Sequence, residues 1–356
     1  MERRITINTD GAGPPAPGRE TAIIWRDQLR QAVRDPDRLM DLLALPENLR
    51  GAARRAAELF PLVVPHAFLA RMRPGDPDDP LLRQILPIGA EEAGATAGFS
   101  EDPVGEADAV RSPGLLQKYH GRALLVVAGV CAVACRYCFR RHFPYDESPS
   151  TMAQWGPALR ELEGSPDVEE VILSGGDPLM REDAWLAELV SLLEEIPHIR
   201  RLRIHTRLPI VIPDRVDDGL LSWLGATRLA PTVVVHATHA AEVDTACGAA
   251  LLRMVQSGIP VLHHAALLRG VNDDADVLTA LSKALLDVRV MPYYLHQLDP
   301  VTGAAHFEVP VARGLELIAE LRQRLPGFGV PRYVQEVVGA AHKVECSSLG
   351  LAPEQR

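Results

Sequence analysis

Three cysteines stand close together at Cys131, Cys135 and Cys138, in a chain that contains five cysteines in all. This CxxxCxxC spacing brings three thiolates to one place, and soft sulfur ligands favour an iron–sulfur cluster or zinc. A fourth cysteine at matching spacing is missing. An iron–sulfur cube held by three thiolates would keep one iron open for a ligand that is not protein. Structural zinc usually takes four protein ligands, and His142 could supply the fourth, so a zinc site stays open here.

A second motif, Ser174-Gly175-Gly176-Asp177 followed by proline, comes directly after an apolar run. Glycines at the end of a strand allow a backbone to approach a ligand closely. A plain turn, with Asp177 near the start of a helix, is the other interpretation. Histidines also follow several apolar runs, but a histidine there is as often a hydrogen-bonded core residue as a ligand, so we assign none to a metal.

The elements that must position these motifs alternate regularly from residue 123 onward. Apolar runs predict strands at 123–128, 170–174, 202–206, 232–236, 259–263, 288–292 and 330–334. Amphipathic patterns predict helices near 151–163, 182–195, 214–224, 242–257, 274–287 and 312–324. This series predicts an α/β fold with a parallel sheet, a partial (β/α)6 barrel of the TIM type. The cysteines follow the first strand and the glycines the second, where such barrels carry their chemistry.

The remaining sequence predicts the organisation of the chain. We expect a flexible tail at 1–20, an N-terminal helical region and connector at 21–112, the barrel at 113–336, and a C-terminal segment at 337–356. The net charge of -10 argues against nucleic-acid binding. There is no apolar run of the ~20 residues that cross a bilayer, and no secretory signal. Sparse, clustered cysteines fit a reducing cytoplasm.

Together, the cysteine and glycine motifs resemble the radical S-adenosylmethionine (SAM) superfamily. The segments 135–142, 203–207, 268–273 and 291–299 further resemble the lysine 2,3-aminomutases, over nearly everything from about residue 20 onward. Within that family, 135–145 and 117–119 look most like the branch that serves (R)-β-lysylation of elongation factor P. The resemblance implies a radical SAM barrel, a [4Fe–4S] cluster on Cys131, Cys135 and Cys138, and SAM bound at Ser174, Gly175, Gly176 and Asp177.

The same resemblance implies pyridoxal 5′-phosphate (PLP), which needs a lysine for its imine. The chain has three lysines, and Lys343 occupies the family's imine position, although His342 departs from the small residues usual before it. Lys283 falls in a helical pattern and is expected at the surface. Lys118 and Arg122 match the positions where the family binds the cofactor phosphate.

For the substrate, the resemblance implies that Arg140 binds the carboxylate. Asp273 and Glu336 match the family's carboxylates for a distal ammonium, with glutamate in place of aspartate at 336. A helix-capping role is the other interpretation of Asp273. Two anionic groups would favour lysine over glutamate.

We therefore expect an isomerase, a lysine 2,3-aminomutase that converts L-lysine to (R)-β-lysine. Its expected pathway partners are elongation factor P and the lysyl ligase that modifies it, and a homodimer is left open. The alternatives are a glutamate 2,3-aminomutase, another radical enzyme without PLP, and a zinc-binding module without catalysis.

Overall fold

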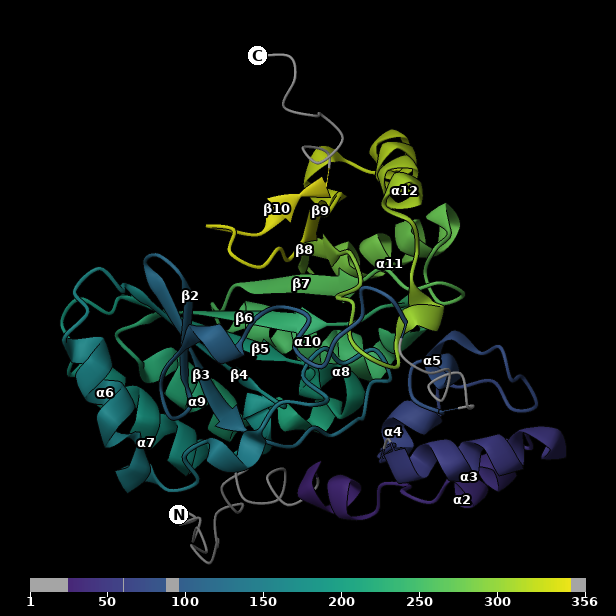
Figure 1. Ribbon diagram of the computed structural model, residues 1–356, viewed down its shortest axis with the longest axis horizontal. Helices are drawn as coiled ribbons and strands as arrows, with labels where there is room; N and C mark the ends of the chain where they lie inside the picture. Colours follow the sequence, from purple (N-terminus) through teal and green to yellow (C-terminus); the bar gives the residue numbers. More distant parts are fainter. Residues whose placement is uncertain (1–24, 60, 88–95, 347–356) are drawn as a thin grey trace, which may run out of the picture.

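Ten strands form one sheet in the computed structural model, which describes residues 25–59, 61–87 and 96–346 (Figure 1). Their spatial order follows the chain from β1 to β10, and β3 through β9 run parallel. The expected tail at 1–20 lies outside the described residues. The strands are β1 (Val110–Ser112), β2 (Leu115–Tyr119), β3 (Arg122–Ala128), β4 (Glu170–Gly175), β5 (Arg201–Thr206), β6 (Ala230–His236), β7 (Val261–Ala266), β8 (Met291–His296), β9 (Arg332–Gln335) and β10 (Val344–Glu345).

One helix lies between each pair of successive parallel strands, and shorter helices precede or interrupt the series. Parallel strands alternate with helices, as expected for this type of barrel. The sheet stays open, with β1 and β10 at its edges, so the barrel is partial and the predicted fold class is confirmed. The helices are α2 (Pro36–Leu42), α3 (Arg50–Leu59), α4 (His66–Leu69), α5 (Pro80–Arg83), α6 (Gly156–Glu163), α7 (Asp183–Glu194), α8 (Leu208–Val211), α9 (Asp218–Ala226), α10 (Thr245–Gln256), α11 (Ala275–Asp287) and α12 (Val311–Arg324).

Local sequence explains where the barrel helices begin. Asp217, Asp244 and Asp274 each precede a helix, and their carboxylates accept hydrogen bonds from its first free backbone N–H groups. Each helix then buries an apolar stripe against the sheet, such as Leu186, Leu189 and Leu193 of α7. Because β3 through β9 are parallel, the strand-to-helix loops, where the chemistry is expected, lie at the same end of the sheet.

The later strands begin further along the chain than the apolar runs predicted. The strand expected at 288–292 is β8 at Met291–His296, because Arg289 has a φ of 61° and turns the chain there. The strand expected at 259–263 is β7 at Val261–Ala266. The sequence interpretation missed β1, β2 and β10, all of which are antiparallel to their neighbours. The missed strand β2 matters for the site, because it carries Lys118.

The N-terminal helices lie together beside one end of the barrel (Figure 1). Arg71, just after α4, donates to the carbonyls of Ile210 at 2.6 Å and Glu242 at 2.8 Å, which ties this region to the barrel. No helix in the described ranges is long and apolar enough to cross a membrane.

Candidate active site

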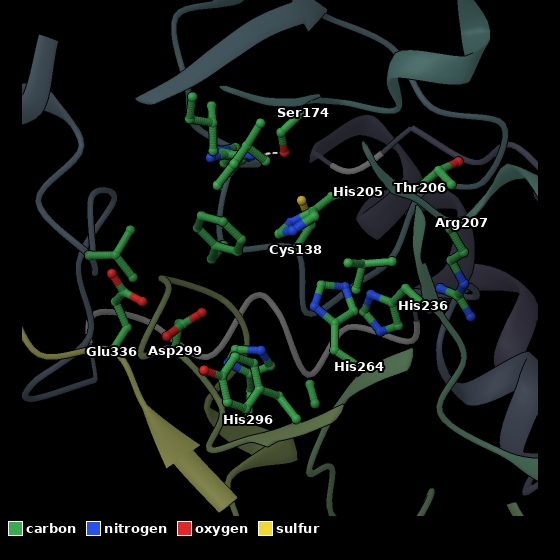
Figure 2. Close-up of a pocket in the computed structure, with 18 of the residues that line it drawn as sticks. Cys138, Ser174, His205, Thr206, Arg207, His236, His264, His296, Asp299 and Glu336 are labelled. Atoms are coloured by element: carbon green, nitrogen blue, oxygen red, sulfur yellow. Dashed lines mark hydrogen bonds between the residues drawn. The ribbon is translucent and has the colours of Figure 1, made fainter. Parts of the chain in front are cut away.

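A cavity of about 670 Å³ occupies the interior of the barrel. Its lining includes the three clustered cysteines, the Ser174–Asp177 segment, Arg140, Lys118, Arg122, Glu336 and Lys343. The residues expected from the sequence to bind the cluster, the cofactors or the substrate therefore share one cavity, except Asp273, and His142, the possible zinc ligand, does not line it either. Figure 2 shows Glu336 and Asp299 on one side of it and Thr206 and Arg207 on the other, with several histidines between.

The cysteine loop and the glycine loop are joined backbone to backbone. Gly176 N–H donates to the Ala128 carbonyl at 2.7 Å, and Asp177 N–H donates to the Val130 carbonyl at 2.9 Å. A Cβ on Gly176 would lie 2.5 Å from the Val130 oxygen, and a Cβ on Gly175, where φ is 118°, would lie 2.4 Å from the Ala128 oxygen. The two glycines thus allow close approach of a neighbouring strand end, which brings the two motifs side by side.

The Asp177 carboxylate is held by hydrogen bonds from the protein itself. Its buried carboxylate accepts hydrogen bonds from Thr206 Oγ1 at 2.7 Å, from the Arg207 N–H at 2.7 Å and from the Leu208 N–H at 2.9 Å. Burial raises the pKa of Asp177, and these hydrogen bonds oppose that rise. Asp177 therefore orients the loop between β5 and α8 more directly than it offers oxygens to a ligand.

Arg207 is a residue whose role the sequence interpretation missed. Its buried guanidinium donates to Cys135 Sγ at 2.7 Å, to Gln84 Oε1 at 2.6 Å and to Glu242 Oε2 at 2.8 Å. Glu242 is completely buried and also accepts from Thr238. No local signal could have linked residues so far apart in the chain.

The donor set on the cysteine loop fits a soft metal centre. Arg207 Nη1 donates to the Cys135 sulfur, so a cation stands beside one of the three sulfur atoms. Burial raises the pKa of Cys138 to about 11 and that of Cys131 well above its usual value, so a metal would have to stabilise those thiolates. As they lie, no three Cys, His, Asp or Glu side chains in the described ranges form a ready metal site. Ligation by these cysteines therefore stays a proposal.

The opposite side of the cavity is built on the hairpin of β9 and β10. Lys343 Nζ donates to Glu336 Oε2, and Tyr119 Oη donates to Glu336 Oε1. Lys118 Nζ lies 3.4 Å from the same carboxylate and 2.5 Å from the Val104 carbonyl. Burial would raise the pKa of Glu336, but the charge of Lys343 and these hydrogen bonds hold it below its usual value.

Asp299, and not Asp273, is the second carboxyl group at this end. Asp273 Oδ1 accepts from the Gly270 N–H at 2.8 Å and does not line the cavity, so it holds its own turn. Asp299 follows β8 and lines the cavity near Glu336 (Figure 2). Burial raises the pKa of Asp299 to about 7, with Lys343 opposing the rise and Glu336 adding to it. The sequence interpretation included Asp299 in a family motif without giving it a role.

Arg140 already has an acidic partner within the protein. Its Nε and Nη2 donate to the two oxygens of Glu106 at 2.8 Å and 2.6 Å, and both side chains are buried. Its Nη1 donates to Ser174 Oγ at 2.8 Å. Only the Nη1 edge of Arg140 therefore faces the loop where a ligand is expected.

Four histidines from successive strands pack edge to face inside the barrel. His264 contacts His205, His236 and His296, with ring centroids 5.1 to 5.4 Å apart. Burial lowers the pKa of His264 to about 3 and lowers those of the other three well below the usual value. The wall between the two sides is thus polar but uncharged at neutral pH.

Comparison with known proteins defines the class to which this fold and site belong. Residues 125–218 match the model of the radical SAM superfamily, whose members use a [4Fe–4S] cluster and SAM. The chain is 46% identical over 344 residues to the L-lysine 2,3-aminomutase of Escherichia coli K12, covering 96% of this chain and 97% of that protein. It is 42% identical over 319 residues to the L-lysine 2,3-aminomutase of Haemophilus influenzae, covering 90% and 94%.

Among solved structures, SuiB of Streptococcus suis bound to S-adenosylmethionine covers 62% of this chain and 51% of its own, with a TM-score of 0.47 and 14% identity. The assignment of this chain to the radical SAM superfamily thus rests on the match at residues 125–218 and on the two relatives. Within it, the chain belongs to the L-lysine 2,3-aminomutase family, a family of isomerases.

Proposed function

We propose that this chain is a PLP-dependent L-lysine 2,3-aminomutase that converts L-lysine to (R)-β-lysine. The observation that carries the proposal is the single cavity, which joins three cysteines and the glycine loop to Lys343 and two carboxyl groups. When bound, the cluster and SAM would supply a radical that removes a hydrogen from Cβ, and PLP would hold the migrating amine.

The donor set at each side suits the group proposed for it. Cys131, Cys135 and Cys138 offer thiol ligands beside the charge of Arg207, with the Ser174–Asp177 loop next to them. Lys343 offers a primary amine inside the cavity, and Lys283, exposed on α11, does not. The chain's own share is to hold these groups within reach of one another and away from water.

The carboxyl groups support a cationic substrate. Glu336 and Asp299 would receive the distal ammonium of lysine, while the side-chain carboxylate of glutamate would meet two like charges. The substrate's own carboxylate would meet Arg140 at its Nη1 edge, beside Ser174. In this proposal Asp299 has the ammonium-binding role that the sequence predicted for Asp273.

An anaerobic assay tests the proposal. Protein with a reconstituted cluster is incubated with dithionite, SAM, PLP and either L-lysine or L-glutamate, and the products are identified by mass spectrometry. We expect β-lysine from the native chain and from Lys283→Ala, and none from Lys343→Ala. Absence of β-lysine from the native chain, β-glutamate as the main product, or zinc without iron and sulfide would contradict the proposal.

We further propose that the product serves β-lysylation of elongation factor P by its lysyl ligase in the cytoplasm. The likeness of residues 135–145 and 117–119 to that branch of the family supports this destination. The test is the mass of elongation factor P in cells without this gene. We expect the β-lysyl mass to disappear, and an unchanged mass would contradict the proposed destination.

A further inference from the structure

Arg203 lies on β5 with its side chain in the wall of the cavity. Its Nη2 donates to Glu170 Oε2 at 2.7 Å, and the two side chains are 15% and 20% exposed. Glu170 is also the register partner of Arg122 on the neighbouring strand β3. Two guanidinium groups therefore stand near one carboxylate, which leaves one net positive charge in a mostly buried place.

Arg203 also has hydrogen-bonding capacity that the protein leaves unfilled. Its Nε is buried without a hydrogen-bond partner, although leaving a buried donor unpaired is unfavourable. His205, two residues further along and therefore on the same face of β5, likewise has a buried Nε2 without a partner and lines the same cavity. This face of β5 thus carries two buried nitrogen atoms without hydrogen-bond partners in residues that line the cavity.

Lys118 and Arg332 are more fully engaged than Arg203, whereas Arg122 has a ring contact and a strand pairing. Lys118, one of the two residues expected to bind phosphate, holds the Val104 carbonyl and lies 3.4 Å from Glu336. Arg332 pairs with Glu345 at the outer edge of the hairpin. Arg122 stacks over the Tyr119 ring and lies beside Glu170 across the β3–β4 pairing. Arg203 and Arg207 both line the cavity with an unpaired buried Nε, but Arg207 is tied to Cys135 and Glu242. Arg203 is the one of the two whose acidic partner, Glu170, also stands beside Arg122 in the sheet.

We propose that Arg203 binds the phosphate group of PLP, together with Arg122. A phosphate oxygen would accept hydrogen bonds from the Arg203 guanidinium, and a forked guanidinium suits phosphate better than an ammonium group does. The position follows from a side-chain hydrogen bond and a strand pairing. Arg203 donates to Glu170, and Glu170 is the strand neighbour of Arg122, the residue already expected at the phosphate. This inference rests on the proposed function and assigns a residue that the family resemblance did not.

Binding of PLP and of pyridoxal, which lacks the phosphate, tests the assignment. The apoprotein is titrated with each ligand, and the visible absorbance of the aldehyde bound to a lysine amine gives the dissociation constant. The variants are Arg203→Met, Arg203→Lys and the control Arg201→Met. Arg201 lies on the same strand and has the same kind of pair, with Glu169 at 2.5 Å, but it does not line the cavity.

We expect Arg203→Met to weaken PLP binding by about tenfold to a hundredfold, the worth of a charge-assisted hydrogen bond. Pyridoxal binding should change by less than about threefold, and Arg201→Met should match the native protein for both ligands. Arg203→Lys should fall between, because it keeps the charge and loses the fork. If Arg203→Met does not fold, Arg203→Lys carries the test, with a weaker PLP affinity and an unchanged pyridoxal affinity.

Equal losses for PLP and pyridoxal, or no loss for PLP, would overturn the inference. So would a role toward the substrate's carboxylate, which would leave PLP affinity unchanged in Arg203→Met and raise the KM for L-lysine. A native protein that never develops the absorbance band, or that keeps it in Lys343→Ala, would mean that the proposed function fails. A native band with the same PLP affinity in Arg203→Met would mean that only the present inference fails.

Discussion

The two sides of the cavity are held in place in different ways. The cysteine and glycine loops are supported by a network of buried hydrogen-bonded groups, with Asp177, Arg207 and Glu242 at the centre. The side with Lys343 is supported by ion pairs to Glu336 on the short hairpin of β9 and β10, near the end of the described chain. One side is part of the barrel core, whereas the other is added at its edge.

This difference suits what each side must do. An inorganic cluster needs rigid ligands and protection from water, and a buried polar network supplies both. A lysine that bonds covalently to a cofactor must change partners, and a partly exposed ion pair allows this. The contrast also separates the variants that should remove the metal, destabilise the fold, or weaken substrate binding.

The largest expected effects distinguish the cysteine side of the cavity from the Lys343 side. Cys138→Ala should lose bound iron and all aminomutase activity, because one of three thiolate ligands is gone. Lys343→Ala should lose the same activity and keep native iron and sulfide. Metal analysis and turnover of anaerobically prepared protein measure both effects. Full iron in Cys138→Ala would place the cluster elsewhere.

The next prediction compares two paired carboxylates. Glu242→Ala should destabilise the protein by about 3–5 kcal/mol, because it leaves the buried charge of Arg207 uncompensated. Glu336→Ala should cost less, about 1–3 kcal/mol, because the cations that it leaves unpaired keep more contact with water than Arg207 does. Lys118 and Lys343 are 21% and 29% exposed and meet that condition. Chemical denaturation gives both values, and equal losses would remove the distinction between core and edge.

A smaller effect is expected at the contact between the cysteine loop and the glycine loop. Gly176→Ala should destabilise the protein by about 1–3 kcal/mol and weaken SAM binding, because the new Cβ meets a backbone oxygen that cannot easily move. Gly225→Ala, in α9 with nothing near its Cβ, is the matched control and should stabilise by up to about 1 kcal/mol. Thermal melts and SAM titration measure these effects. Native SAM affinity in Gly176→Ala would mean that the loop contact is not needed for the site.

The smallest effect concerns Asp299 and pH. Its pKa is raised to about 7, so the carboxyl group is neutral below that pH and charged above it. Because the lysine ammonium needs the charged form, kcat/KM should fall about tenfold per pH unit below 7 and level off above it. Asp299→Asn should lower kcat/KM for L-lysine by about tenfold at pH 8 and lose this limb of the profile. An unchanged profile in Asp299→Asn would assign the limb to another group, and Asp273→Asn is the control.

Contiguous motifs and the alternation of strands and helices could be predicted from the sequence. Neighbouring parallel strands end at the same edge, so Cys131–Cys138 and Ser174–Asp177 had to meet once the barrel was recognised. The side with Lys343 was harder to predict. Both Asp273 and Asp299 follow apolar strands, and only the fold decides that one holds a turn and the other lines the cavity.

Long-range partners left no signal in the sequence at all. Glu106 lies in the irregular connector, yet its carboxylate accepts hydrogen bonds from two of the three guanidinium nitrogen atoms of Arg140. Arg207 and Glu242 pair across 35 residues, and Arg203 carries its unfilled Nε in an ordinary strand pattern. Such contacts depend on side-chain direction, which periodicity does not specify to the level of single atoms.

The central claim is that both sides act on one substrate in one cavity. The most direct measurement is hydrogen transfer from L-lysine deuterated at C3, followed by mass spectrometry of 5′-deoxyadenosine and SAM after anaerobic turnover. The account predicts deuterium in these adenosyl compounds with the native chain and none with Lys343→Ala. Cleavage of SAM by the native chain, with β-lysine formed but no deuterium transferred, would contradict it.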